Sequence, residues 1–389
     1  MEKRAIVISC SDHYEHRMKY WDVSLRGLGF ETTYVTTDFL HVEKKPYVCP
    51  VEGCVQLHVM PYRKNLSVQR ILSHRMFARK VYRYLEEVRP QTVVSLLPPN
   101  FLVKYLAKYK KRHPEVKLIL DIFDLWPETF PSSKVKKLLA PVFRVWANLR
   151  DKHLHAADFV TAECDMFRER LGLSDDRSET VYFSLEPYCG PREEVALPTD
   201  RADIAYLGSI NNIIDISRIV SFLSELNGRI PTTLHVIGGG EKCEEFCDSV
   251  RAVGVEVDYC GKVFDETEKH RILSRCHFGL NVMKSSVCVG LTMKSVDYFR
   301  HGLPIVNTIP ADTEQLIRER GIGVHVNDVE TSAGTIEALI RRGVGSMKDA
   351  SVRTFDELFS SSKNLAHCQT VLLRVLESRS ASDGEFGKL

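Results

Sequence analysis

Short apolar segments alternate with longer helical patterns along almost the whole chain, and this alternation limits the fold more than any other feature. The segments expected to be strands are 5–9, 32–37, 55–60, 92–97, 117–124, 158–163, 180–184, 204–210, 233–240, 255–261, 278–283, 305–308 and 321–326. Helical patterns separate most of them, including a long basic one at 67–88 and another near 134–153. Such alternation predicts βαβ units whose parallel sheets are buried on both faces.

The chain is long enough for two cores rather than one, since it has 389 residues. Residues 186–203 are rich in proline and acidic side chains and show no periodicity, which is typical of a linker. We therefore expect two doubly wound α/β domains, at 1–190 and 200–389. Because open parallel sheets bind ligands beyond the carboxyl ends of their strands, the two domains are expected to face a central cleft. The final helical pattern, from about 354 to 378, either stays with the second domain or crosses back to the first.

The net charge of +2 conceals an uneven distribution. Residues 1–150 carry 26 Lys and Arg against 14 Asp and Glu, and residues 151–389 carry 27 against 37. A basic first half indicates an anionic partner, such as nucleic acid, a membrane surface or a phosphorylated substrate. No nucleic-acid-binding motif is recognised, so we expect no nucleic acid partner.

Three basic segments, 63–83, 104–113 and 134–152, mix Lys and Arg with aromatic and aliphatic residues. Helices of this composition either lie on anionic lipid headgroups or present a solvated face over a sheet. The sequence has no apolar run long enough to span a membrane, and its amino terminus does not resemble a signal peptide. We expect a cytoplasmic protein in contact with the inner face of the membrane. Its eleven cysteines complete no zinc pattern and are expected to be reduced.

Residues 288–308 carry the strongest chemical signal. Gly290 precedes a short helix for which Thr292 is the expected N-cap and Gly302 the residue just past the end. A glycine before a helix start allows a phosphate to approach backbone N–H groups and the positive end of the helix dipole. Lys294 supplies a charge for phosphate, and Asp297 one turn later can accept hydrogen bonds from a sugar hydroxyl. This combination suits a nucleoside diphosphate.

A second candidate site follows the apolar segment 117–124. Asp124 and Glu128 are placed where an open sheet binds ligands, and Trp126 is expected to offer a flat surface for a sugar ring. Asp124 is interpreted as a general base or as a cap for the next segment. His13, His16 and Arg17 follow the first strand, where they contact the substrate or fill a polar turn.

Two absences shape the expected mechanism. The glycine-rich segment 235–241 is not a GxGxxG motif, and a structural turn explains it better. The sequence also contains no Asp-x-Asp, the spacing that commonly holds a divalent ion on sugar-nucleotide phosphates. We therefore expect no metal and no cofactor, with lysines and helix dipoles neutralising the diphosphate instead.

The order YLGSI, HVIGGGE, YCGKV and GLTMKSVDYFRHGLPIVNT resembles the carboxyl domains of glycosyltransferase family 4, which have the GT-B fold. DLWPE is similar to a segment in the amino domains of members that build bacterial polysaccharide and lipopolysaccharide. The resemblance implies retaining, metal-independent transfer from a UDP- or GDP-linked sugar to a glycan or lipid-linked acceptor in cell-surface polysaccharide biosynthesis.

The resemblance also implies roles for individual residues. Lys294 and the N–H groups around Gly290, Leu291 and Thr292 would stabilise the leaving nucleoside diphosphate, and Asp297 would hold the ribose. Further donor-side candidates are Lys262, Val263 and Lys284. Asp124 would act with Lys294 in catalysis, and the acceptor side would comprise His13, His16, Arg17, Trp126 and Glu128.

Two departures from the family pattern leave an alternative open. Val289 stands where the family has the first of two glutamates, and residues 208–215 lack the family's Arg and Lys. The alternative is a GT-B subunit that binds a nucleotide or glycan without catalysis and supports a partner enzyme. Epimerisation of a nucleotide sugar is a weaker possibility.

Overall fold

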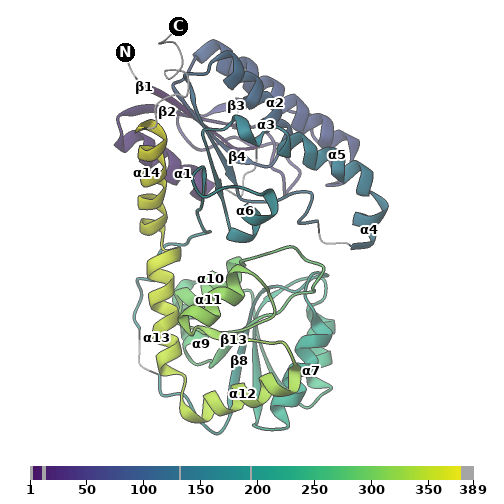
Figure 1. The fold of residues 1–389 in the computed structure, drawn as a ribbon. Helices are drawn as coiled ribbons and strands as arrows, with labels where there is room; N and C mark the ends of the chain where they lie inside the picture. Colours follow the sequence, from purple (N-terminus) through teal and green to yellow (C-terminus); the bar gives the residue numbers. More distant parts are fainter. Residues whose placement is uncertain (1–2, 11–14, 131–132, 193–194, 378–389) are drawn as a thin grey trace. The chain divides into compact units, whose positions relative to one another are not determined.

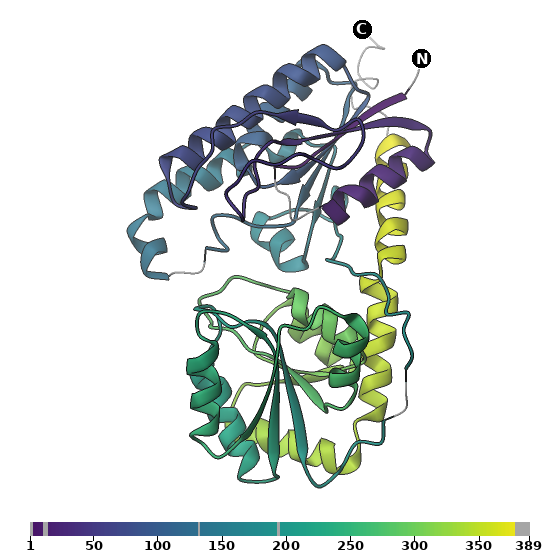
Figure 2. The ribbon, with the colours of Figure 1, turned by 180° about the vertical axis from the view of Figure 1, so that it is seen from behind.

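The chain folds into two compact α/β units. The computed structural model describes residues 3–10, 15–130, 133–192 and 195–377 (Figures 1 and 2). The first unit comprises Met1–Tyr182 together with Asn364–Leu389, and the second comprises Phe183–Lys363. Each unit contains one parallel sheet, which confirms the predicted α/β class. No helix in the described ranges combines the length and apolar content needed to cross a membrane.

The first unit contains a seven-stranded sheet in the order β3-β2-β1-β4-β5-β6-β7. Its strands are β1 (Lys3–Ile8), β2 (Phe30–Thr37), β3 (Val55–Leu57), β4 (Thr92–Leu97), β5 (Lys117–Ile122), β6 (Phe159–Ala162) and β7 (Ser178–Thr180). All six pairings are parallel, and the order reverses between β1 and β4. In such sheets the carboxyl edge at the reversal is the usual ligand position.

Helices cover both faces of this sheet. They are α1 (Glu15–Gly27), α2 (Val68–Val88), α3 (Asn100–Arg112), α4 (Ser133–Leu138), α5 (Ala140–Asp151), α6 (Asp165–Leu171) and α14 (Ser361–Glu377). α1 and α14 lie side by side on one face (Figures 1 and 2). The final helix thus joins the core of the first unit, where Cys368 and Leu372 are fully buried with Trp21 of α1.

A buried ion pair ties α1 to the sheet. Arg17 donates from Nε and Nη2 to the two carboxylate oxygens of Asp121 in β5, both at 2.7 Å. Trp21 Nε1 and Thr161 Oγ1 also donate to this carboxylate, each at 2.7 Å. Arg17 Nη1 donates to the carbonyl of Val181 at 2.7 Å. Although burial opposes the charge, Asp121 raises the pKa of the Arg17 guanidinium above its ordinary value.

The second unit contains a six-stranded sheet in the order β10-β9-β8-β11-β12-β13. Its strands are β8 (Ala202–Ser209), β9 (Thr232–Gly239), β10 (Glu256–Gly261), β11 (Phe278–Asn281), β12 (Ile305–Asn307) and β13 (Gly323–His325). All pairings are parallel, and the order reverses between β8 and β11.

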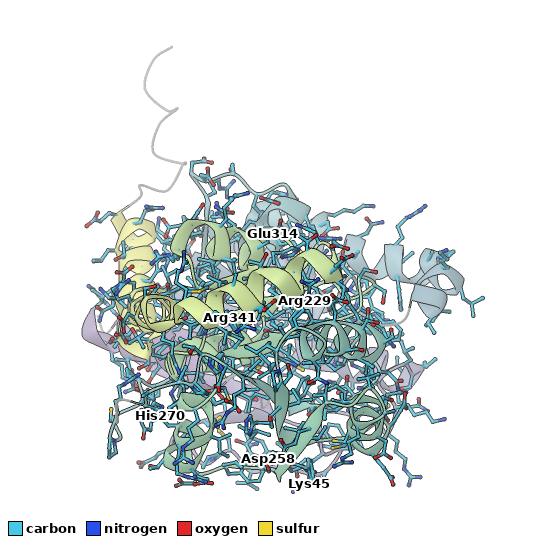
Figure 3. The ribbon with its side chains drawn as sticks, turned by 90° about the horizontal axis from the view of Figure 1, so that it is seen from below. Lys45, Arg229, Asp258, His270, Glu314 and Arg341 are labelled. Carbon is cyan, nitrogen blue, oxygen red and sulfur yellow. The ribbon has the colours of Figure 1, made fainter. Side chains whose placement is uncertain are left out.

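The helices of the second unit complete its doubly wound arrangement. They are α7 (Ile216–Asn227), α8 (Cys243–Arg251), α9 (Glu266–Ser274), α10 (Met293–Arg300), α11 (Asp312–Arg320), α12 (Val329–Arg342) and α13 (Gly345–Thr354). One core forms where α7, α8 and α12 pack on the sheet. Charged side chains such as Arg229 and Arg341 mark the outer side of this layer (Figure 3). They pair with Glu225 and Glu337, each one turn earlier in the chain.

Several predicted elements differ in their boundaries, and two examples lie in the first unit. The helix expected near 134–153 is two helices, α4 and α5, because Pro141 lies in the first turn of α5 and suits a helix start rather than an interior. The last strand of the first unit ends at Thr180, so only the beginning of the predicted segment 180–184 belongs to it.

The Asp121 network yields a stability prediction. Asp121→Asn should lower the free energy of unfolding of the first unit by about 3–5 kcal/mol, because it leaves the Arg17 charge buried without its counter-charge. Urea unfolding followed by tryptophan fluorescence measures this. Glu31→Gln breaks the exposed Arg4–Glu31 pair and should change stability by no more than about 1 kcal/mol. Equal losses in the two variants would contradict the role assigned to Asp121.

Candidate functional site

The site in the second unit is built around the start of α10. Thr292 has extended backbone angles and accepts a hydrogen bond from the Ser295 N–H through its Oγ1, at 3.1 Å. Gly302 follows the helix with a positive φ of 74°, which a glycine adopts without strain. The predicted N-cap and the predicted terminating glycine are both confirmed.

A chain of buried polar side chains fixes this helix start against the sheet. Thr292 Oγ1 donates to Asn281 Oδ1 at 2.8 Å, and Asn281 Nδ2 donates to Asn307 Oδ1 at 2.9 Å. Both asparagines are fully buried and end β11 and β12. Sequence reasoning missed them, although an asparagine near the end of two consecutive apolar segments was a usable signal.

Tyr298 sets the distance between α10 and the sheet. Its hydroxyl accepts a hydrogen bond from the Leu207 N–H of β8 at 2.7 Å, and its ring lies against Gly279 of β11. A Cβ at Gly279 would lie 2.7 Å from that ring, so a larger residue would push α10 away. This packing brings the side chains of α10 to the carboxyl half of β8.

Lys294 is a largely buried cation without a counter-charge. Its Nζ lies 3.2 Å from the Tyr206 hydroxyl and 4.4 Å from the centre of that ring. Within the described ranges, no carboxylate forms an ion pair with it. Burial lowers the pKa of the Lys294 ammonium to about 8. The Tyr206 hydroxyl donates to the Ser209 carbonyl at 2.9 Å, which places this pair at the end of β8.

Two further lysines lie at the same edge of the sheet. Lys284 Nζ donates to the Asn212 carbonyl, in the turn after β8, at 2.8 Å. Lys262 follows β10 and lies across Gly239, where an added Cβ would be 3.4 Å from its Cε. The Ile210 N–H joins the two turns by donating to the Gly239 carbonyl at 2.9 Å. The structure therefore gathers three of the predicted donor-side lysines around the turns that end β8 and β9.

The glycine-rich segment 235–241 has a packing explanation. A Cβ at Gly238 would lie 2.0 Å from the Gly208 carbonyl oxygen, and one at Gly240 would lie 2.3 Å from that of Ile210. Both glycines also have positive φ angles. The turns after β8 and β9 can approach this closely only because these positions lack side chains, which favours the structural interpretation.

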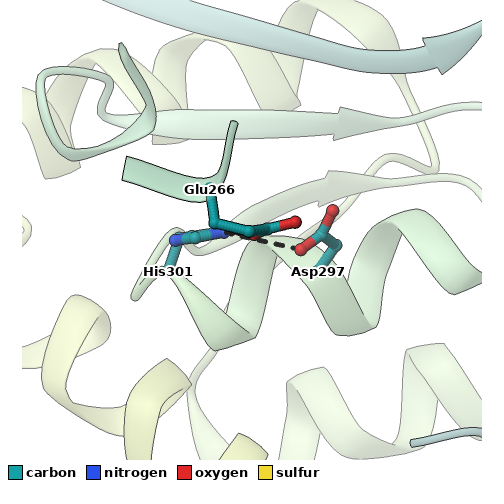
Figure 4. Close-up of side chains that lie close together, drawn as sticks. All are labelled: Glu266, Asp297 and His301. Carbon is teal, nitrogen blue, oxygen red and sulfur yellow. Dashed lines mark ion pairs between the residues drawn. The ribbon is translucent and has the colours of Figure 1, made fainter. Parts of the chain in front are cut away.

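Asp297 lies in an ion-pair cluster on the next turn of α10 (Figure 4). Its carboxylate is 3.1 Å from Lys269 Nζ and 3.5 Å from His301 Nε2. Although burial favours the neutral acid, His301 and Lys269 hold the pKa of the Asp297 carboxyl below its ordinary value. Asp297 is thus already paired, a contact that sequence reasoning did not foresee.

The same cluster has the ligand types of a metal site. Glu266, Asp297 and His301 present one ligand atom each within 4.8 Å of one another. However, Arg300 pairs with Glu266 at 2.8 Å and Lys269 pairs with both carboxylates. Two cations therefore balance the two carboxylates, which indicates an ion-pair network.

Val263, the remaining donor-side candidate after β10, has a different environment. It lines a cavity of about 280 Å³ with His235, Asp258 and Arg271. Asp258 pairs with His235 at 3.0 Å. Gly290 is anchored by its carbonyl, which accepts from the Thr313 hydroxyl at 2.6 Å.

In the first unit, Asp124 lies just beyond β5. Its Oδ1 accepts a hydrogen bond from the Thr129 hydroxyl at 2.6 Å. Burial raises the pKa of the Asp124 carboxyl. Glu163, just beyond the neighbouring β6, has its pKa raised to about 8 by burial. Sequence reasoning placed Glu163 in an ordinary strand and missed this second acid at the sheet edge.

Three acceptor-side candidates have structural partners. Glu128 forms a two-point ion pair with Arg150 at 2.7 and 3.1 Å. The expectation that Trp126 offers an open face to a sugar is wrong, because the residue is only 8% exposed and packs against Trp146. The placement of Arg17 beside a substrate is also wrong, since the helix starts at Glu15 and turns this side chain inward to Asp121.

The structure describes only one of the two histidine candidates. His16 is exposed and lines a cavity of about 380 Å³ with Met18, Tyr34 and Cys49. His13 lies outside the described residues. All eleven cysteines are free thiols.

Known structures resemble this chain along nearly its whole length. Sucrose-phosphate synthase of Thermosynechococcus elongatus matches with a TM-score of 0.67 at 11% identity, over 96% of this chain and 99% of that one. The lipopolysaccharide outer core galactosyltransferase WaaB matches with a TM-score of 0.66 at 14% identity, over 95% and 99%. HepE of Anabaena, in complex with UDP, matches with a TM-score of 0.63 at 10% identity, over 95% and 99%.

The chain has the GT-B fold. No family model matches the sequence, and the search of curated proteins gives no significant match. The GT-B fold agrees with the strand order of each unit, and the resemblance at this identity extends to the fold alone.

Lys294 yields a prediction about stability and pH. Lys294→Met should raise the free energy of unfolding at pH 7 by about 1–3 kcal/mol, because it removes a buried charge and keeps the contact with Tyr206. Since burial lowers the folded-state pKa to about 8 from 10.5, the unfolded chain binds more protons between these values. The wild type should therefore gain stability as the pH rises from 8 to 10.5. The difference in the free energy of unfolding between Lys294→Met and the wild type should shrink over the same range.

Urea unfolding at pH 7 and pH 10 measures both effects. Lys363→Met, at an exposed position in the same unit, is the control and should show neither. A loss of stability in Lys294→Met at pH 7 would mean that the lysine has a structural role instead.

Proposed function

We propose that this protein is a glycosyltransferase that takes a sugar from a UDP- or GDP-linked donor. The observation that carries the proposal is the largely buried Lys294 ammonium at the carboxyl edge of a GT-B sheet, which pairs with no carboxylate among the residues that the structure describes. A diphosphate would supply the missing negative charge. Structures of HepE, a neighbour in fold, contain UDP and UDP-glucose, which supports a donor of this class.

The donor side consists of positive groups around two turns. Lys294, Lys284 and Lys262 surround the diphosphate, and the N–H groups from Gly290 to Thr292 add the dipole of α10. Positive groups fixed before the reaction stabilise the charge that develops on the leaving diphosphate without having to reorganise. We propose that this arrangement replaces a divalent metal.

Asp297 is proposed to contact the ribose while Lys269 and His301 hold its carboxylate in place. On the first unit, Asp124 is the proposed acceptor-side group, which would accept the proton of the attacking hydroxyl. The proposed outcome is retention at the anomeric carbon. The acceptor is proposed to be a glycan or lipid-linked glycan of cell-surface polysaccharide, a class related to the lipopolysaccharide named for WaaB.

We also propose peripheral contact with an anionic membrane. Leu138 is 80% exposed, and Val142 and Val145 of α5 are 49% and 66% exposed. Exposed basic side chains, Lys137 and Arg144, lie beside them in the sequence. Apolar side chains among basic ones are the pattern by which a surface helix binds lipid headgroups.

A donor-release assay tests the transferase proposal. Lys294→Ala should reduce the rate of UDP or GDP release from a matching nucleotide sugar about 10²- to 10³-fold, because the negative charge on the leaving diphosphate is no longer stabilised by the ammonium. The thermal stabilisation by the same nucleotide should also fall.

Lys363→Ala is the matched control and should behave as the wild type. Full turnover in Lys294→Ala would refute the donor assignment. If the wild type binds the nucleotide but neither transfers sugar nor releases UDP or GDP from any donor tested, the non-catalytic subunit is favoured instead. Two features motivate that alternative: Asp297 is already paired with Lys269, and Val289 replaces a glutamate of the family.

Vesicle sedimentation tests the membrane proposal. The double variant Val142→Ser, Val145→Ser should bind vesicles rich in phosphatidylglycerol about two- to tenfold less than the wild type, because apolar contact area is lost. Binding should also weaken as salt rises. Val48→Ser changes a valine that is 83% exposed elsewhere on the first unit and should have no effect. Equal effects of the two changes would contradict the assigned contact surface.

A further inference from the structure

The first unit also contains a buried cation, Arg70, that pairs with no carboxylate in the described ranges. Arg70 belongs to the first turn of α2 and is 6% exposed. In the part of the chain that the structure describes, it forms no ion pair, and its Nε has no hydrogen-bond partner. Burial lowers the pKa of the guanidinium, although an arginine remains charged at neutral pH.

The Arg70 side chain folds back toward the amino end of its own helix. Its Nη1 donates to the Asn65 carbonyl at 3.0 Å, two residues before the N-cap Ser67. Ser67 accepts from the Arg70 N–H at 3.2 Å, and α2 has no acidic residue in its first turn. The guanidinium and the positive end of a helix of 21 residues therefore lie together.

Lys44 is a second cation near this site, whereas the Asp124 carboxylate raises the pKa of Arg70 through its charge without forming an ion pair with it. Lys44 donates to Asn65 Oδ1 at 2.6 Å and lies 4.8 Å from the centre of the Tyr62 ring. His74, one turn after Arg70, is 5% exposed and has no partner for its Nδ1. Burial and the nearby charges of Arg70, His41 and Lys44 lower the pKa of His74 well below its ordinary value, so it stays neutral.

A purely structural role accounts for only part of this arrangement. The Arg70 guanidinium lies 5.1 Å from the centre of the Trp126 ring, a contact that favours a cation. The contact leaves the Nε unsatisfied, and no carboxylate of the described residues accepts the planar fork of donors. Arginine presents this fork in the geometry that matches phosphate.

We infer that Arg70 and the amino end of α2 bind a phosphoryl group carried by the acceptor. The inference rests on the proposed transferase function and adds the chemical class of the acceptor. The site lies in the same unit as Asp124, whose pKa the Arg70 charge lowers in opposition to burial. The phosphoryl group belongs either to a soluble phosphate ester or to a lipid headgroup, and the two sources are separable by experiment.

The test uses the full chain saturated with the nucleotide that stabilises it most, so that the lysines of the second unit are occupied. Glycerol phosphate is titrated by calorimetry, and vesicles containing phosphatidylglycerol are titrated by sedimentation. Arg70→Met should weaken binding of at least one probe tenfold or more. Arg70→Lys should weaken it less, because it keeps the charge and loses the fork. Arg79→Met removes an exposed arginine from the same helix and is the matched control.

Each outcome decides the matter. Loss confined to glycerol phosphate supports a soluble ester, and loss confined to vesicles supports a lipid headgroup. Wild-type affinity of Arg70→Met for both probes, or equal loss in Arg79→Met, overturns the inference. If the nucleotide raises the melting temperature of Arg70→Met, this variant is folded. If it does not, Arg70→Lys is used as the test variant in its place. A wild type without that stabilisation would count against the proposed function, whereas the glycerol phosphate titration would still report on Arg70.

Discussion

The Lys294 ammonium lies against Tyr206, and no carboxylate of the described residues balances its charge. The surrounding contacts hold it in this position. Tyr298 packs into the space left by Gly279 and fixes α10 on the sheet. The Thr292–Asn281 hydrogen bond fixes the start of the helix. A buried charge lowers stability unless a partner offsets it. Rigid support for an unbalanced cation is therefore what a site for an anionic ligand requires.

The first unit uses buried charge in the opposite way. Asp121 accepts four hydrogen bonds, two of them from Arg17, so that its charge is fully satisfied and joins α1 to the sheet. Arg70, by contrast, is as buried as Arg17 but forms no ion pair with any carboxylate in the described part of the chain. The difference between a satisfied and an unsatisfied arginine in the same unit separates a structural role from a binding role. It also puts the proposed phosphoryl-binding site at the amino end of α2.

Local patterns predicted the fold and the frame of the donor site. The alternation of strands and helices, the Thr292 cap and the Gly302 terminus depend on residues close in sequence, so they were accessible. Arg17 was misplaced because its partner Asp121 lies 104 residues away. Trp126 was misplaced because α5 supplies the Trp146 that covers it. The pairing of Asp297 with Lys269 was likewise hidden, since it depends on how α9 packs beside α10.

The central claim is that Lys294 receives a diphosphate. Calorimetry of UDP or GDP binding at pH 8, in buffers of different ionisation enthalpy, measures the protons taken up on binding. The free ammonium has a pKa of about 8, and a bound diphosphate should raise it. The wild type should then take up about half a proton per nucleotide, and Lys294→Met should take up none. Nucleotide binding without proton uptake in the wild type, or with equal uptake in the variant, would contradict this account.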